Sequence, residues 1–308
     1  MNQYGATRQG LGTYRRMEEI SGWLFASPWI LGFLLFTAGP MIASAFFAFT
    51  DYNIVQPPRW VGPQNFSRAF REDPLVWQSL KVTTIYAFAS VPLQIFLGLT
   101  VALLLNVKIG GLQYYRTIYY LPAVLSGVAV ALLWRWIFSP NYGLINAILG
   151  ILGIQGPAWL GDARWALPSL IIMSLWHIGG GMVVYLAGLQ GVPTELYEAA
   201  EVDGANWSRK LVSITIPMVT PVLFYQLVTG IISSLQVFTQ ALIMTDGGPK
   251  NATLFFMLYL YRNAFQYFKM GYASLLAWVL FVYILGLTLL VLRSSSFWVY
   301  YAGGSSRG

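Results

Sequence analysis

The residues best suited to chemistry are concentrated in one acidic stretch in the second half of this 308-residue chain. The stretch contains three carboxylates and two alanines and ends in a glycine: Glu198, Ala199, Ala200, Glu201, Asp203 and Gly204. Carboxylates can pair with Lys and Arg side chains of a partner, and alanines let a second surface approach closely. An acidic run by itself is more often a solvated loop, so its interpretation depends on the residues around it.

A second set of polar and small residues lies inside apolar segments. His177 follows Trp176 and precedes a run of glycines that includes Gly180. A tryptophan beside a polar group can hold a sugar by stacking and by hydrogen bonds to its hydroxyls. Farther along, four residues follow the i, i+3, i+4, i+7 spacing of one helix face: Gly230, Ser233, Ser234 and Val237. Small residues in a membrane helix also mark close helix packing, and both interpretations stay open.

Several classes of catalytic site are missing from the sequence. The phosphate-binding pattern G-x-x-x-x-G-K-[ST] does not occur, and Gly247-Gly248-Pro249-Lys250 has neither its spacing nor its hydroxyl residue. The single His and the absence of Cys exclude metal sites that need two His or a thiolate. No basic cluster is interleaved with aromatic residues. We therefore expect no ATPase site, no cofactor and no nucleic-acid partner.

The composition predicts a membrane protein. Hydrophobic residues make up 57% of the chain and charged residues 9%, with a mean hydropathy of +0.60 and a net charge of +7. Soluble domains carry roughly a quarter charged residues. Because a helix satisfies its own backbone in lipid, six long apolar stretches predict six transmembrane helices in an all-α fold. The stretches are 21–50, 80–107, 114–138, 166–190, 218–244 and 272–292.

The predicted spans contain almost no ionisable side chains. Asp51 and Lys81 lie at span ends, and Arg135 lies near one. Ion-coupled transporters generally keep such residues near the middle of the membrane, where the coupling ion binds. An external energy source is therefore favoured, with an energy-independent facilitator or channel as the alternative.

The acidic stretch is predicted to form a short helix between two spans. Thr194 suits the N-cap, and Gly204 suits the C-terminal turn because glycine adopts positive φ without a steric penalty. Asn206 or Ser208 can begin a second short helix, after which Pro217 opens the next apolar span.

The spacing within this loop resembles the EAA loop of the membrane-spanning subunits of ABC importers. Glu198-Ala199-Ala200 is followed after three residues by Gly204, and after nine more by Ile214-x-Ile216-Pro217, where the family usually has Leu in place of Ile216. The outer-loop motifs Asp73-Pro74 and Asp246-Gly247-Gly248-Pro249 resemble those of carbohydrate-type permeases related to the larger membrane subunit of the maltose transporter. The resemblance runs from about residue 20 to 293, without that subunit's additional N-terminal helices and periplasmic insertion.

The resemblance implies a type I ABC importer permease fold in the plasma (inner) membrane. The acidic helix would be the coupling helix, which docks on a dimer of cytoplasmic ATPase subunits. A second permease subunit and an extracellular or periplasmic sugar-binding protein would complete an importer in which ATP hydrolysis in the partner drives passage of a sugar. Lys and Arg are divided evenly between the two sides, so the orientation with both termini cytoplasmic rests on this resemblance.

The same resemblance implies a division of the chain and a substrate pathway. The divisions are a cytoplasmic segment (1–20), a six-helix permease domain (21–293) with a coupling loop (192–216), and a cytoplasmic tail (294–308). By motif position, the pathway residues are Ala123, Ser126, Gly127, Trp176, His177, Gly180, Gly230, Ser233, Ser234 and Val237. A permease for an amino acid, phosphate or metal is a further alternative, against which the outer-loop motifs argue.

Overall fold

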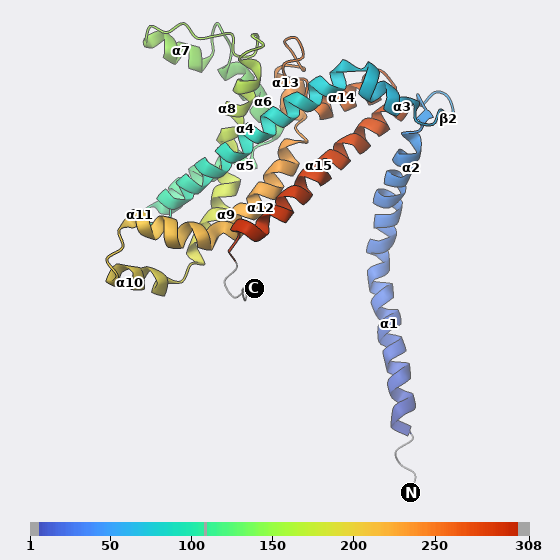
Figure 1. Ribbon diagram of the computed structural model, residues 1–308, viewed down its shortest axis with the longest axis horizontal. Coiled ribbons are helices and arrows are strands. Elements are labelled where there is room, and N and C mark those ends of the chain that lie inside the picture. The colour runs from blue at the N-terminus through green and yellow to red at the C-terminus, as the bar shows by residue number, and fades with distance from the viewer. Residues whose placement is uncertain (1–5, 108–109, 301–308) are drawn as a thin grey trace.

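The computed structural model describes residues 6–107 and 110–300, and its account of side chains begins at residue 16. It is built almost entirely of helices (Figure 1). Four of them are long and apolar enough to cross a membrane: Arg16–Phe47, Pro74–Leu104, Trp207–Ser234 and Met270–Trp298. Two bent pairs bring the number to six if each pair is one span: Leu112–Val124 with Gly127–Ile137, and Ala166–His177 with Gly179–Gln190. The predicted all-α membrane fold is confirmed.

The first part of the N-terminal helix extends away from the other helices (Figure 1), whereas its last part packs against the final span. It consists of α1 (Ala6–Phe33), a π-helical turn (Leu34–Ala38) and α2 (Gly39–Phe47). The widened turn precedes Pro40, which has no backbone N–H, and so lets the helix continue through the proline. Because α1 begins at Ala6, the predicted boundary at residue 20 falls inside a helix.

A small cap connects this helix to the next span. It contains the antiparallel strands β1 (Thr50–Asp51) and β2 (Arg59–Trp60), then α3 (Gln64–Ser67) and a π-helical turn (Arg68–Glu72). The second span is α4 (Pro74–Leu104).

The third span is not the straight helix predicted over residues 114–138. It is divided into α5 (Leu112–Val124) and α6 (Gly127–Ile137), which meet at an angle of 99°. Leu125 and Ser126 are both extended, with ψ of 146° and 132°. Two successive extended residues end one helix and redirect the next. The bend therefore comes from backbone conformation that apolar composition does not reveal.

The fourth span is also bent. It comprises α8 (Ala166–Ser174), a 3-10 turn (Leu175–His177) and α9 (Gly179–Gln190), with an angle of 45° at the break. Between the third and fourth spans lies the short α7 (Leu144–Ile151). After the fourth span comes α10 (Thr194–Val202), which contains most of the acidic stretch.

The fifth span begins earlier and ends earlier than the predicted 218–244. The short α11 (Trp207–Lys210) continues through a π-helical turn (Leu211–Thr215) into α12 (Ile216–Ser234). Within this turn the N–H of Ile216 bonds the carbonyl of Leu211, and the wider turn accommodates Pro217. The prediction that Pro217 separates two helices was therefore wrong. The chain then leaves the helix, and α13 (Thr239–Met244) is a separate element.

The last span packs back onto the fifth. This last span is α15 (Met270–Trp298). It is preceded by α14 (Phe256–Tyr261) and a π-helical turn (Arg262–Gln266). The backbone N–H of Tyr300 donates to the Thr220 hydroxyl of α12 at 2.8 Å. The predicted tail, 294–308, thus starts inside α15, and residues 301–308 lie outside the described part of the chain.

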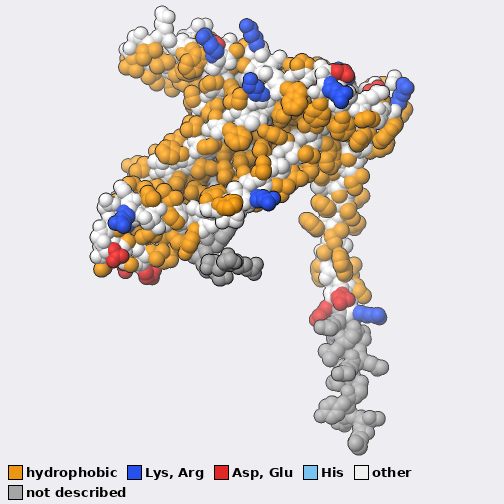
Figure 2. Space-filling view, in the orientation of Figure 1, with side chains coloured by type: hydrophobic (Ala, Val, Ile, Leu, Met, Phe, Trp, Pro, Cys, Tyr) orange, Lys and Arg blue, Asp and Glu red, His pale blue; other side chains and the backbone are white. Residues whose placement is uncertain are grey.

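Glycines bring the central helices close together. The span α4 packs against α9 and α12. A Cβ at Gly98 would lie 2.9 Å from the Tyr185 ring, and one at Gly188 would lie 2.7 Å from Val222. Larger residues at these two positions would force the helices apart, as expected where membrane helices associate through small residues. Figure 2 shows hydrophobic side chains over most of the outer surface of the spans.

The carboxylate of Asp73 joins the start of α4 to α14 and α15. It lies at the same end of the spans as β2 and α3. One carboxylate oxygen caps α4 by accepting from the N–H of Leu75 at 3.0 Å. The other accepts from the hydroxyls of Tyr259, in α14, and Tyr272, in α15, the latter at 2.7 Å. The Arg68 guanidinium lies over the Tyr272 ring, 5.1 Å from its centroid.

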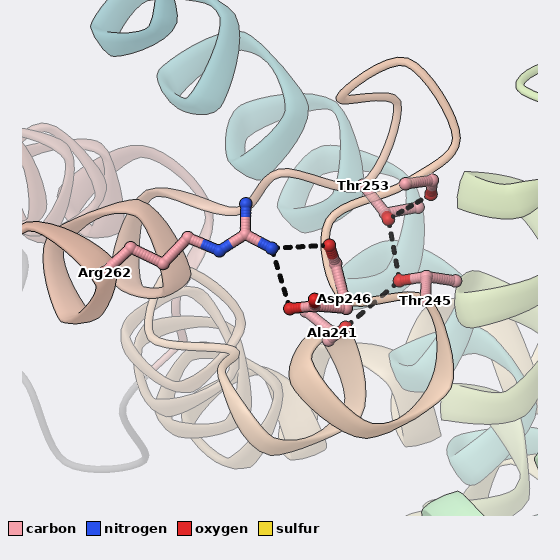
Figure 3. A network of polar contacts seen from close by, with 6 residues as sticks. Ala241, Thr245, Asp246, Thr253 and Arg262 are labelled. Carbon is pink, nitrogen blue, oxygen red and sulfur yellow. Dashed lines mark hydrogen bonds and ion pairs between the residues drawn. The ribbon is translucent and has the colours of Figure 1, made fainter. Parts of the chain in front are cut away.

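The segment between α13 and α14 is fixed by its own polar contacts (Figure 3). Arg262 donates to the backbone carbonyl and the carboxylate of Asp246, both at 2.7 Å. The Thr253 hydroxyl lies 2.7 Å from both the hydroxyl of Thr245 and the carbonyl oxygen of Gly248. The Asp246-Gly247-Gly248-Pro249 motif is therefore a rigid loop.

We expect Tyr272→Phe to destabilise the chain, because it removes a hydrogen bond to a charged acceptor, which contributes about 1.5–3 kcal/mol. Thermal unfolding in detergent measures the effect, with Tyr225→Phe at an exposed position of α12 as the matched control. Equal unfolding midpoints for the two variants would show that the Asp73 cluster contributes nothing to stability.

Candidate functional site

A cavity of about 340 Å³ lies between α4, the fourth span and α12. Its lining is polar but uncharged: hydroxyl, amide and imidazole groups occur among apolar side chains, with no carboxylate, Lys or Arg. The polar residues that line it are Tyr86, Gln94, Ser174, His177, Tyr185, Gln226, Thr229, Ser233, Ser234 and Gln240. Such groups can donate and accept hydrogen bonds to hydroxyls, and no fixed charge there repels or selects an ion.

The structure brings five of the predicted pathway residues together at this cavity. They are His177, Gly230, Ser233, Ser234 and Val237. The predicted common face of the fifth span is confirmed as far as Ser234, where α12 ends, and Val237 reaches the cavity from the segment that follows. A Cβ at Gly230 would lie 3.1 Å from Val91 of α4, so this glycine also permits close helix packing.

The other predicted pathway residues lie elsewhere. Trp176 contacts Trp134 edge to face, with ring centroids 6.0 Å apart. Gly180 faces α5, where a Cβ would lie 3.9 Å from that of Ala123. Ser126 and Gly127 are exposed at the break between α5 and α6. These residues do not line the cavity.

Sequence reasoning missed several lining residues. Gln226 and Thr229 continue the polar face of α12 one turn toward its N-terminus, so extending the i, i+4 spacing backward from Gly230 and from Ser233 would have found them. Tyr86 and Gln94 of α4 and Tyr185 of α9 reach the cavity through helix packing, for which the sequence carries no local signal. Among the described residues, no group of three His, Cys, Asp or Glu side chains could hold a metal ion.

The acidic stretch forms α10 and a glycine turn, as predicted. Gly204 has φ +72°, its N–H bonds the carbonyl of Glu201, and the N–H of Ala205 bonds that of Ala200. These two bonds form a Schellman motif, which needs the left-handed conformation that glycine adopts freely. Of the two predicted starts of the next helix, Asn206 and Ser208, the structure has Asn206, which caps α11 by accepting from the N–H of Arg209 at 2.9 Å.

The predicted N-cap of α10 was wrong. Pro193 occupies that position, Thr194 is the first helical residue, and the cap has no side-chain hydrogen bond. Proline fixes its own φ and tends to keep the preceding residue out of the helix, so Pro193 is sufficient to set the start.

The surface of α10 is open and partly apolar. Val202 is 89% exposed, Leu196 is also an exposed large hydrophobic residue, and Trp207 at the start of α11 is exposed as well. Glu198, Ala199 and Asp203 are exposed beside them. A mixture of carboxylates, small residues and exposed apolar side chains on one short helix is suited to protein docking.

Two side-chain contacts join α10 to the helix that lines the cavity. The Tyr197 hydroxyl lies 2.9 Å from that of the buried Thr215, which itself donates to the carbonyl of Lys210 at 3.3 Å. Lys210 pairs with Glu201 at 2.7 Å, and the ammonium lowers the pKa of this exposed carboxyl. Tyr197 also packs against the apolar cluster around Leu189 and Val219. The acidic helix is therefore attached to the start of the fifth span.

Comparison with known proteins identifies the family. Residues 85–302 match the binding-protein-dependent transport system inner membrane component family. The chain is 45% identical over 290 residues to the probable ABC transporter permease protein YesP of Bacillus subtilis, covering 93% of this chain and 94% of that one. It is 33% identical over 285 residues to the trehalose/maltose transport system permease protein MalF of Thermococcus litoralis, covering 91% and 95%.

A solved structure agrees with this assignment. The crystal structure of a bacterial alginate ABC transporter in complex with an alginate pentasaccharide-bound periplasmic protein contains a chain that is 26% identical to this one. The two match with a TM-score of 0.80 over 92% of this chain and 96% of that one. The protein therefore belongs to the family of binding-protein-dependent inner-membrane transport components, the permeases of ABC importers.

Proposed function

We propose that this chain is the permease subunit of an importer that moves a sugar across the plasma membrane, powered by ATP hydrolysis in a separate subunit. The observation that carries the proposal is that one continuous helix, Trp207–Ser234, bears the acidic loop at one end and lines the cavity with the other. The uncharged, hydroxyl-binding lining suits a saccharide. The relatives named for trehalose/maltose and alginate transport support the same substrate class.

The proposed partners are those that membership of the family implies. A dimer of cytoplasmic ATPase subunits docks on α10 through Glu198, Ala199, Ala200, Glu201, Asp203 and Gly204. A second permease subunit completes the transmembrane pathway, and a sugar-binding protein delivers substrate at the opposite end. This chain has no ATPase site of its own. The start of α1, the end of α15 and α10 lie at one end of the molecule (Figure 1), which we assign to the cytoplasm.

The proposed movement is a rigid-body one. When the ATPase subunits close, they push α10, and the Tyr197–Thr215 and Glu201–Lys210 contacts carry the push into α12. Movement of α12 changes the side of the membrane to which the cavity opens. His177, Ser233 and Ser234 contact the sugar, while Trp176 and Gly180 position His177 and the break beside it. Ser126 and Gly127 belong to the part of the pathway shared with the second permease.

Docking is tested by reversing one charge on α10. We expect Glu198→Arg to lower sugar-stimulated ATP hydrolysis by about tenfold or more, because like charges placed together at an interface cost several kcal/mol. Gly204→Asp should act in the same direction by straining the positive-φ turn. Glu19→Arg, an exposed reversal on α1, is the control. Full stimulated activity in both α10 variants would contradict the docking assignment.

The attachment of α10 to α12 is tested by removing one hydroxyl. We expect Tyr197→Phe and Thr215→Val to transport about two- to tenfold less sugar per ATP hydrolysed, the range that corresponds to losing one hydrogen bond. Thr215→Ser keeps the hydroxyl and should preserve coupling. ATPase activity, assembly and thermal stability are measured alongside. A fall in stability with an unchanged ratio of transport to hydrolysis would mean that the contact is only structural.

The cavity is tested by filling it. We expect Ser233→Phe and Ser234→Phe to reduce sugar uptake at normal expression, since a loss of about 1.4 kcal/mol in binding already lowers affinity tenfold. Ser296→Phe, at an exposed position near the end of α15, is the matched control. Uptake by both variants equal to that of the control would place the sugar pathway elsewhere.

A further inference from the structure

The short helix α7 and the turn after it carry an exposed apolar surface that the proposed transport function does not use. Leu144, Ala147, Ile148 and Ile151 follow the i, i+3, i+4, i+7 spacing of one helix face, and all four are exposed. Ile151 is 85% exposed, and Leu152 and Ile154 extend the surface past the helix end. An apolar surface of this kind marks an interaction site.

The helix is held firmly in place, so its exposed face has a fixed direction. Asn146 donates to the carbonyls of Pro140 and Pro157 at 3.1 and 3.3 Å, and it accepts from the Trp159 indole N–H at 2.7 Å. Trp159 is itself buried in the main apolar cluster. Ile145 and Leu149, on the other side of α7, pack against that cluster.

The end of α7 is equally well defined. Gly153 has φ +72°, and its N–H and that of Ile154 close the helix on the carbonyls of Gly150 and Leu149. This Schellman turn brings Ile154 beside the helix end, next to the apolar face. The whole surface is therefore one preformed unit.

We propose that this apolar surface of α7 lies in the membrane interface and is covered by lipid, in the leaflet opposite the α10 loop. Figure 1 shows α7 at the end of the spans away from α10, lying crosswise to α1. A helix in this direction runs along the membrane plane and not through it. Figure 2 shows the hydrophobic side chains of this lobe gathered on the side facing back along α1, where the membrane must lie.

The chemistry of the surface favours lipid over a protein that binds and leaves. The segment from Trp136 to Gly161 contains no Asp, Glu, Lys, Arg or His. Transient protein interfaces mix polar and apolar groups, and their surfaces must be soluble between encounters. Exposed Trp136, Tyr142 and Trp165 flank α7, and such amphipathic rings concentrate at membrane interfaces.

Depth-dependent quenching tests this proposal in the complete transporter. The chain has no native Cys, so a fluorophore can be placed at Ile151→Cys or Ile148→Cys alone, with the partner subunits made free of cysteine. Gly150→Cys is the matched control, because a Cβ there meets nothing within 4 Å and points about 100° away from Ile151. The assembled complex is studied in nanodiscs whose lipids carry nitroxides at the headgroup or the upper acyl chain.

We expect lipid nitroxides to quench the fluorophore at 151 and 148 about threefold or more strongly than at 150, as for side chains that enter the headgroup boundary. Equally weak quenching at all three positions would overturn the proposal. Quenching that disappears when the sugar-loaded binding protein is added would assign the surface to that protein instead. Because quenching is read without transport, these outcomes are independent of the proposed substrate.

Discussion

The contacts between α10 and the start of the fifth span are what the functional account depends on. The Tyr197 and Thr215 hydroxyls and the Glu201–Lys210 ion pair fix a short, exposed helix to a long one that continues to the cavity. The long helix is continuous because the widened turn before Pro217 keeps its backbone hydrogen bonds in place. Without that continuity, a push on α10 would be absorbed in the loop. With it, a displacement at one end of Trp207–Ser234 reaches the residues that line the cavity.

In the proposed movement, the packing around the cavity converts that displacement into a change of shape. Close contacts at Gly98, Gly188 and Gly230 hold α4, α9 and α12 at a short distance from one another. Helices packed this closely move as bodies and do not deform continuously, so a cavity between them opens on one side or the other. The break in the fourth span places irregular backbone at the cavity, which His177 lines. Such backbone is tolerated at membrane depth where it is buried in protein or lines a cavity.

The sequence was sufficient for the fold class, for the six apolar stretches and for the helix and glycine turn of the acidic loop. Gly204 could be assigned, and the start of α11 narrowed to Asn206 or Ser208, because these roles depend on local backbone and side chains. The bend at Leu125 and Ser126 could not be predicted, because apolar composition does not reveal backbone conformation. The continuity through Pro217 could not be predicted either, because a proline can end a helix or be accommodated by a π-helical turn, and tertiary packing decides which. The cavity residues divide in the same way. The face of α12 follows from helical spacing, whereas Tyr86, Gln94 and Tyr185 are brought to it by other helices.

The central claim is that force enters this chain from another subunit through α10. A photocrosslinking amino acid at Val202, which is 89% exposed on that helix, tests it directly in intact cells. We predict that irradiation links this chain to a protein whose sequence, read by mass spectrometry, contains a phosphate-binding loop, and that the same label at Val55 in the outer loop does not. Crosslinks from Val202 only to lipid or to a second copy of this chain, at normal transport activity, would contradict the account and favour an energy-independent facilitator.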